Sequence, residues 1–431
     1  MSNEDFLKVA DKIKEIISGS EFEDHVFFVG GCCRDSVLGH PIKDIDIVVD
    51  IPNGGIRFAE WLDDNKLLEH KPVVYPVYST AMFTLSVFPD IELEAVQTRK
   101  EMYTDPTNRN PVTAYGTIGE DCYRRDFTTN TLYMKMDGSI LDITGTGLED
   151  IKNGVIRTPL EPNETFCDDP LRILRAIRFA SRYNWKITEN TMAGMKVNTD
   201  RLEIISRERI ADELKKMLSC EHPCYALEQI KEIGAVKHIF GMYGKQYSDI
   251  SKAEVYFSNA IRDLKVYETN DWLLNFTVIL MGTFSTMLDI EDVMKSLKLS
   301  NEEMNYVKSV RNMTYRLCEI DDGVSDNATY RKFIRSCKTD KVLNDSVFIH
   351  DTYMFPDNKK DDFIKVVVEN DMRDYSVDWF TYRLPVDGND VMSVLNVKPG
   401  KIIRDTLDKL MDIVYKCPFM TKEDLLKTIK Q

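Results

Sequence analysis

The sequence has no long hydrophobic run, no disulfide framework and no excess of basic charge. No segment approaches the about 18 uninterrupted apolar residues that indicate a membrane-spanning helix. The first residues, MSNEDFLKVADKIKEII, are acidic and amphipathic, and they resemble neither a signal peptide nor an arginine-rich transit peptide. The nine cysteines share no repeated spacing, and the adjacent Cys32 and Cys33 do not easily bridge each other. These absences predict a protein of the cytoplasm or a similar reducing compartment.

Histidine is also scarce, with six residues in 431. Cys220, His222 and Cys224 lie together in CEHPC, but no second cysteine or histidine pair follows at zinc-finger spacing. Ordinary residues at a helix end are therefore favoured over a zinc site.

The formal net charge of −15 argues against a protein that coats nucleic acid through a broad basic surface. A local basic groove remains compatible with this charge. Residues 152–216 hold 13 Lys/Arg against 10 Asp/Glu, although the chain as a whole is acidic. This segment is the first candidate for binding a polyanion.

The length predicts two or three domains, because one hydrophobic core rarely grows to this size. Up to about residue 150, short β-rich runs such as HVFFV and IDIVV alternate with turn residues, which predicts an α+β head built on a small mixed sheet. From about residue 165 the apolar spacing becomes three and four, which is typical of helices. We expect a head at 1–150, a helical neck at 151–220, and a helical body and tail at 221–431.

A glycine pair follows the first apolar run of the head. VFFV ends at Gly30 and Gly31, and CCRDSVL then has helical spacing until Gly39. Backbone N–H groups at a helix start favour phosphate, and Arg34 adds a positive charge about one turn inside. For a lone glycine pair, a plain strand-turn-helix corner is the favoured interpretation.

Alternating aspartates mark the next strand, KDIDIVVD. Side chains alternate along a strand, so Asp44 and Asp46 share one face while Ile45 and Ile47 share the other. Two such carboxylates suit a hard divalent cation such as Mg²⁺, which also keeps water and substrate phosphate as ligands. A solvated strand face is the alternative for an isolated Asp-x-Asp.

Taken together, GGCCRDSVLGHPIKDID resembles the signature of the polymerase-β-type nucleotidyltransferases, in particular the class II tRNA nucleotidyltransferases (CCA-adding enzymes) and bacterial poly(A) polymerases. EDCYRRDFTTNTLYM is similar to the second motif of that family, and LDITGTGLEDIKNGVIRT to its third. FCDDPLRILRAIRFASRYNW resembles the nucleotide-selecting helix, and SRERIADELKKML the closing motif of the neck. The five ordered motifs cover about half of the chain.

The helix in DDPLRILRAIRFASR has a charged face. At about 100° per residue its four arginines fall on one arc and the apolar residues on the opposite one. Pro170 suits a first helical turn, and Asp168 and Asp169 complement the positive helix start. A row of like charges needs an anion, whereas a solvated face normally interleaves its signs. The four arginines are Arg172, Arg175, Arg178 and Arg182.

The resemblance implies a role for each residue that matches a motif. Asp169 and Arg172 match the pair that reads the Watson–Crick edge of the incoming base, and their donors and acceptors fit cytosine and adenine. Asp168 stands where many members have Glu, so its bracing of Arg172 is in question. The residues expected on the ribose and phosphate side are Gly31, Arg34, Arg125, Asp126, Arg175 and Arg178. Asn130 is expected to hold the local turn, and Asp126 to bind nucleotide or only to orient Arg125.

The implied chemistry is two-metal nucleotidyl transfer. Asp44 and Asp46 are the expected catalytic metal ligands for Mg²⁺, and Glu94 in IELEAV is a third candidate unless it merely faces solvent. The resemblance thus implies template-independent addition of C, C and A to tRNA 3′ ends from CTP and ATP, with no membrane partner. A poly(A) polymerase and an enzyme that adds only A or only C share these motifs. A catalytically silent RNA-binding relative is the alternative of a different class. A Rossmann NAD site is excluded, because Gly30 and Gly31 lack a third glycine.

Overall fold

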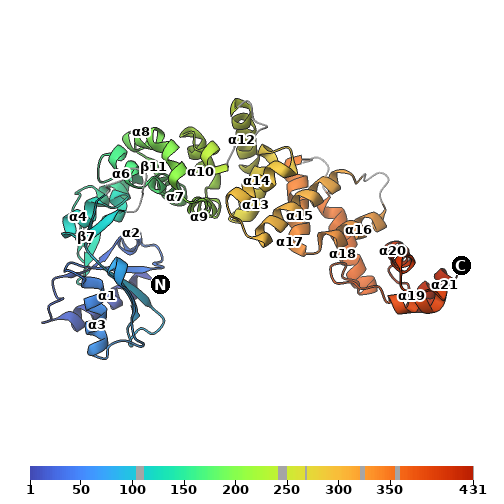
Figure 1. The fold of residues 1–431 in the computed structure, drawn as a ribbon, viewed down its shortest axis with the longest axis horizontal. Coiled ribbons are helices and arrows are strands. Elements are labelled where there is room, and N and C mark those ends of the chain that lie inside the picture. The colour runs from blue at the N-terminus through green and yellow to red at the C-terminus, as the bar shows by residue number, and fades with distance from the viewer. Residues whose placement is uncertain (103–110, 241–249, 267–268, 321–325, 355–359, 431) are drawn as a thin grey trace. The chain divides into compact units, whose positions relative to one another are not determined.

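The computed structural model describes residues 1–102, 111–240, 250–266, 269–320, 326–354 and 360–430 (Figure 1). The chain forms two compact units, Met1–Ser248 and Asp249–Gln431. The first contains every strand in the described residues, and the second is helical throughout its described secondary structure. The predicted α+β head followed by a mostly helical remainder is confirmed.

A seven-stranded mixed sheet forms the centre of the head, in the order β3-β4-β5-β2-β1-β8-β9. The central strands β2 and β5 run parallel, and every other neighbouring pair is antiparallel. The strands are β1 (Val26–Val29), β2 (Ile45–Val49), β3 (Val73–Tyr75), β4 (Thr80–Thr84), β5 (Glu92–Gln97), β8 (Tyr133–Lys135) and β9 (Ile140–Leu141). A separate hairpin pairs β6 (Arg99–Met102) with β7 (Val112–Tyr115).

Helices and short turns connect the strands of the head. Gly54 and Gly55 at the start of the third helix approach β2 and β5 so closely that a Cβ atom at Gly55 would lie 2.3 Å from the Ala95 carbonyl oxygen. These helices are α1 (Asn3–Ile17), α2 (Gly31–Leu38), α3 (Gly54–Asp64), α4 (Ile118–Tyr123) and α5 (Gly147–Asn153). Two 3₁₀ turns, η1 (Pro76–Tyr78) and η2 (Thr128–Asn130), complete this part.

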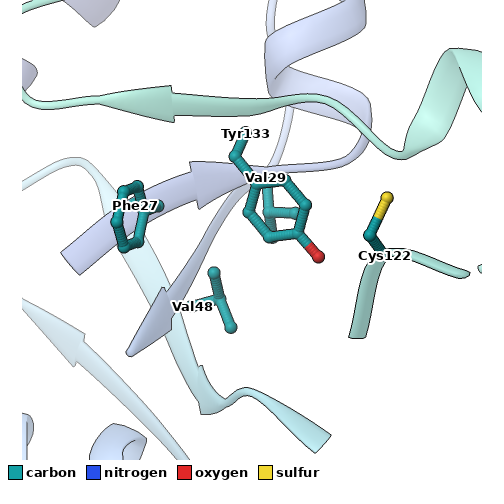
Figure 2. Close-up of a cluster of buried hydrophobic side chains, with 5 residues drawn as sticks. All are labelled: Phe27, Val29, Val48, Cys122 and Tyr133. Carbon is teal, nitrogen blue, oxygen red and sulfur yellow. The ribbon is translucent and has the colours of Figure 1, made fainter. Parts of the chain in front are cut away.

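A buried cluster lies on the face of the sheet where β1, β2 and β8 meet α4 (Figure 2). Phe27, Val29, Val48, Cys122 and Tyr133 form it, and the Phe27 and Tyr133 rings meet edge to face at 6.4 Å. The Tyr133 hydroxyl emerges from this apolar cluster and donates to Asp121 at 2.6 Å. The core of the head therefore holds a charged group at a fixed place.

The rest of the first unit is helical, apart from a short parallel pair of β10 (Val155–Ile156) with β11 (Lys186–Ile187). Its helices are α6 (Pro162–Asp168), α7 (Leu171–Tyr183), α8 (Glu189–Asn198), η3 (Thr199–Ile204), α9 (Arg207–Leu218), α10 (Pro223–Glu232) and α11 (Val236–Phe240). On α7 the apolar side chains Ile173, Leu174 and Ile177 are buried, as the helical spacing predicts.

The predicted helix start around Asp168 needs one correction. Asp168 ends α6, whereas Asp169 is extended (φ −134°, ψ 100°) and Pro170 precedes α7. Proline disfavours helical geometry at the residue that precedes it. The extended Asp169 therefore separates α6 from α7. Pro170 is the N-cap residue of α7, and Asp169 contacts the helix start through its Oδ1, which accepts from the Leu171 amide at 3.1 Å.

The second unit packs its helices around buried apolar residues such as Phe276, Ile279, Val307 and Phe333. Its helices are α12 (Ile250–Leu264), α13 (Trp272–Thr283), α14 (Met287–Ser296), α15 (Asn301–Cys318), α16 (Asn327–Cys337), α17 (Asp340–Ile349), η4 (His350–Met354), α18 (Asp361–Tyr375), α19 (Gly388–Leu395), α20 (Lys401–Lys416) and α21 (Lys422–Ile429). Among the described residues, no helix combines the length and the apolar character that crossing a bilayer requires.

Candidate active site

The predicted metal-binding carboxylates lie on adjacent parallel strands. Asp44 directly precedes β2, Asp46 lies within it, and the register pairs Asp46 with Glu94 of β5. Partners in register face the same side of a sheet, so the three carboxylates line one cavity of about 680 Å³. Burial, and then the negative charge of Glu94, raises the pKa of Asp46 to about 6.

This crowding of negative charge fits a divalent cation, which would relieve the repulsion. The described residues contain no group of three or more Asp, Glu, His or Cys side chains placed to enclose a metal by themselves. Asp44 and Glu94 are exposed, so the predicted metal site would be open to solvent. An open carboxylate pair suits Mg²⁺, because this ion usually takes its remaining ligands from water and substrate phosphate.

The predicted strand-turn-helix corner is present. Gly30 has φ 76°, a backbone conformation that residues with a side chain rarely adopt. The first turn of α2 begins at Gly31. A Cβ atom at Gly30 would lie 3.6 Å from Arg125 Nη1 and 4.0 Å from Asp46 Oδ2. The glycine turn thus lies close to an arginine and to one of the predicted metal-binding carboxylates.

A second cavity, of about 330 Å³, also has Asp44 and Asp46 in its lining. It brings together the glycine turn, both aspartates and arginines from three separate segments. Its lining includes Gly30, Gly31, Arg34, Asp44, Asp46, Arg125, Asp126, Asn130, Arg175, Arg178, Phe179 and Arg182. Two carboxylates beside several guanidinium groups form the environment that a metal-bound triphosphate requires.

Asn130 connects two of the predicted nucleotide-binding residues. Its Oδ1 accepts from Arg34 Nη1 at 2.6 Å, and its Nδ2 donates to Asp126 Oδ1 at 2.9 Å. Arg34 is only 4% exposed and also donates to Asp35 Oδ1 at 2.9 Å. Asn130 therefore positions side chains besides ending a short 3₁₀ turn.

Asp126 orients an arginine, but a different one from the predicted Arg125. Arg175 donates to Asp126 Oδ2 through Nε at 2.8 Å and Nη2 at 2.6 Å. Burial opposes ionisation of Asp126, but the Arg175 charge and the Asn130 hydrogen bond outweigh it and lower its pKa to about 2. Arg178 donates to Glu213 Oε2 of α9 at 2.6 Å. Arg175 and Arg178 thus have carboxylate partners, which reduces the repulsion within the row of like charges.

Arg125 is held by Asp121, a residue that the sequence analysis missed. Arg125 donates to Asp121 Oδ2 through Nε at 3.1 Å and Nη2 at 2.7 Å, and Arg124 donates to Oδ1 through Nε at 3.0 Å and Nη2 at 2.6 Å. Burial alone would raise the pKa of Asp121, but the Arg125 and Arg124 charges hold it well below its usual range. The sequence contained a signal for these pairs, because Asp121 of α4 lies three residues before Arg124 and four before Arg125. Residues at these spacings are neighbours on a helix.

The predicted base-reading pair lines a third cavity, of about 580 Å³, that shares Arg125, Asp126 and Arg175 with the second. Arg172 donates to the carbonyl oxygens of Arg124 at 2.7 Å and Thr165 at 3.3 Å. Asp169 Oδ2 lies 3.8 Å from Arg209. These two carbonyl groups orient Arg172. The neighbouring Asp168 is partly buried, and this burial raises the pKa of its carboxyl group.

Phe179 of α7 is surrounded by three guanidinium groups of the second cavity. Its ring centre lies 4.3 Å from the guanidinium carbon of Arg178, 5.0 Å from that of Arg34 and 5.5 Å from that of Arg175. Each such contact contributes about 0.5–2 kcal/mol, depending on burial. The ring therefore helps to hold these three arginines in place, in addition to their hydrogen-bond partners.

We expect F179L to weaken CTP binding by about fivefold, because leucine keeps an apolar side chain but removes the ring that holds the arginines. Titration of CTP without RNA measures this effect, and thermal unfolding checks that the variant is folded. F179Y keeps the ring and serves as the matched control. Unchanged CTP affinity in folded F179L would contradict the role of the ring.

Two family models match the sequence of the chain. The poly A polymerase head domain matches residues 26–157, and the probable RNA and SrmB-binding site of polymerase A matches residues 184–243. The CCA-adding enzyme of Ligilactobacillus salivarius is 29% identical over 99% of this chain and 97% of its own. These matches support the family of class II CCA-adding enzymes and poly(A) polymerases for this chain. Members of this family generally use divalent metal ions.

Further similarity extends over nearly the whole length. The mitochondrial CCA tRNA nucleotidyltransferase of Candida glabrata is 27% identical over 93% of this chain and 89% of its own. The structure of the Bacillus stearothermophilus CCA-adding enzyme in complex with CTP matches with a TM-score of 0.73 at 20% identity, over 99% of this chain and 96% of the other. The Thermotoga maritima CCA-adding enzyme complexed with tRNA matches with a TM-score of 0.66 at 22% identity, over 99% and 94%. At these identities the structural matches establish the fold.

Proposed function

We propose that this protein adds C, C and A to the 3′ end of tRNA from CTP and ATP without a nucleic-acid template, and releases pyrophosphate. One observation carries the proposal: the cavity lined by the base-reading pair Asp169 and Arg172 shares Arg125, Asp126 and Arg175 with the arginine cavity lined by Asp44 and Asp46. A nucleoside triphosphate has a base at one end and phosphates at the other, and the joined cavities offer the matching groups in that order. The named relatives support the same reaction.

Asp44 and Asp46 would hold the divalent metal, which we propose to be Mg²⁺, with Glu94 as a third ligand. When bound, such ions lower the pKa of the attacking RNA 3′-hydroxyl and neutralise charge on the leaving pyrophosphate. The protein contributes alignment and electrostatics, since Arg34, Arg125, Arg175 and Arg178 surround the place of the triphosphate. The proposal requires no side-chain general base.

Base selection follows from the polarity of two side chains. The Asp169 carboxylate accepts from an exocyclic amine, and the Arg172 guanidinium donates to a ring nitrogen or carbonyl. Cytosine and adenine present an amine at that edge, whereas uracil and guanine present the opposite polarity. Because Asp169 also accepts from the Leu171 amide, the protein backbone fixes its direction before a nucleotide binds.

The remaining assignments extend the same proposal. We propose a head at 1–150, a nucleotide-selecting neck at 151–220 and a tRNA-binding body and tail at 221–431. The acceptor arm and 3′ end of tRNA are the proposed RNA partners. All nine cysteines are free, which supports the proposed cytoplasmic or similar reducing compartment. Complete sets of carboxylates and arginines disfavour a catalytically silent relative.

The decisive experiment supplies purified protein and Mg²⁺ with a tRNA transcript that ends at its discriminator base. We expect two additions with CTP alone, and one further addition when ATP is also present. A long ladder with ATP alone would instead identify a poly(A) polymerase, and addition of only A or only C would identify an enzyme of split activity. No incorporation at all would leave the silent relative.

A further inference from the structure

The turn η1 (Pro76–Tyr78) carries two of the most exposed large apolar side chains of the head. Val77 is 82% exposed and Tyr78 is 64% exposed, and neither contributes to the buried core. Both line the same 580 Å³ cavity as Asp169 and Arg172. Single apolar side chains on a protein surface need no special explanation. An aromatic ring that lines a polar cavity is different, because it can contact a ligand bound in that cavity.

The turn is held firmly in place although its side chains are exposed. The next residue, Ser79, is buried, adopts φ 50° and donates through Oγ to Asn53 Oδ1 at 3.3 Å. A Cβ atom at Gly55 would lie 2.8 Å from the Ser79 carbonyl oxygen, so α3 packs directly against the turn. Tyr78 is therefore presented to the cavity from a fixed backbone, and binding a ligand there costs little ordering of the chain.

The rest of the lining of this cavity is mostly charged. Arg99, Arg124, Arg172, Arg209, Glu101 and Asp169 supply donors and acceptors, and these groups suit the edge of a nucleobase. A base also has two apolar faces. Charged side chains that contact only its edge leave these faces partly exposed to water. An aromatic ring supplies the stacking surface that such a face requires.

We propose that Tyr78 stacks on the base of the incoming nucleotide while Asp169 and Arg172 read its edge. This inference rests on the proposed function and adds a positioning residue to it. Stacking tolerates any base, so Tyr78 contributes affinity for both CTP and ATP, whereas the charged pair contributes selectivity. The larger purine ring offers more overlap, and Tyr78 therefore contributes more to ATP binding than to CTP binding.

The test measures equilibrium binding of CTP, ATP and inorganic tripolyphosphate to the full chain in the absence of RNA. We expect Y78A to weaken CTP binding by about tenfold, and ATP binding by more. Tripolyphosphate has no base, so its affinity is expected to stay unchanged. Y78F keeps the ring and is expected to bind like the wild type. Tyr75 is 44% exposed on β3 but is not among the described residues that line this cavity, so Y75A is the matched control.

Three results would overturn the inference. Binding of CTP and ATP by Y78A with wild-type affinity would contradict it, and a rise in KM for tRNA alone would place Tyr78 against the RNA 3′ end instead. An equal loss of tripolyphosphate affinity would mean a general disturbance of the site. Failure of the wild-type protein to bind or incorporate CTP would overturn the proposed function itself, and the binding series distinguishes the two failures.

Discussion

Replacing Asp46 by alanine is expected to lower kcat for CTP addition by at least about 10³-fold while the fold stays intact. Asp46 lies on the central strand β2 and lines both cavities that meet at the proposed metal site. Loss of a metal ligand removes several kcal/mol of charge stabilisation from the transition state, and each 1.36 kcal/mol is about tenfold in rate. Single-turnover assays with saturating CTP and tRNA measure the chemical step.

The control for this prediction is Asp64→Ala, which removes an exposed carboxylate at the end of α3. We expect it to have wild-type kcat. Circular dichroism and thermal unfolding establish that D46A is folded, and its stability is not expected to fall, because the change relieves repulsion from Glu94. Normal turnover by D46A would rule out the metal assignment.

The Asp121→Asn change is expected to destabilise the protein by about 3–5 kcal/mol, since it leaves buried arginines without their carboxylate. Asp121 is fully buried and accepts from Arg124, Arg125 and the Tyr133 hydroxyl. Asparagine keeps the volume and removes the charge, so the loss reports electrostatics rather than a cavity. Chemical denaturation of wild type and variant measures the difference. KM for CTP is expected to rise as well, because Arg125 loses its orientation.

The pH dependence provides a second test of Asp121. Its folded-state pKa is lowered, so its contribution to stability is complete above the unfolded-state pKa of about 3.9 and declines as pH falls below it. The difference between wild type and D121N is therefore expected to shrink below about pH 4. Asp137→Asn removes an exposed carboxylate of a turn and is the matched control, with an expected change within about 0.5 kcal/mol. Equal stability of D121N and wild type at pH 7 would contradict the proposed role.

Local patterns were enough to predict the elements that carry the site. The alternation in KDIDIVVD predicted a strand that buries Ile45 and Ile47, and the structure forms β2 there. The glycine pair predicted a turn into a helix, because only a residue without a side chain readily adopts the positive φ of Gly30. These features depend on neighbours within a few residues, so the sequence contains all the information that they need.

Partner choice among the charged residues could not be predicted in the same way. Arg172, Arg175 and Arg178 were expected along one face of a helix. Their hydrogen-bond partners lie in separate segments: the Arg124 carbonyl oxygen for Arg172, Asp126 for Arg175 and Glu213 of α9 for Arg178. A guanidinium group has five N–H donors and can pair with many different acceptors. Only the packing of distant segments decides which acceptor it meets. The exchange of Asp126 and Asp121 as the partner of Arg125 illustrates this limit.

The sequence by itself determined the family, the order of α+β head and helical remainder, and the residues that match its motifs. The tertiary structure alone decided which groups meet. The parallel pairing of β2 with β5 sets Glu94 beside Asp46, the core residue Tyr133 helps to hold Asp121, and an anchored turn brings Tyr78 to the base-reading cavity. The physical reason is that strand register and side-chain packing join residues far apart in the chain, whereas periodicity and turn chemistry act only between neighbours.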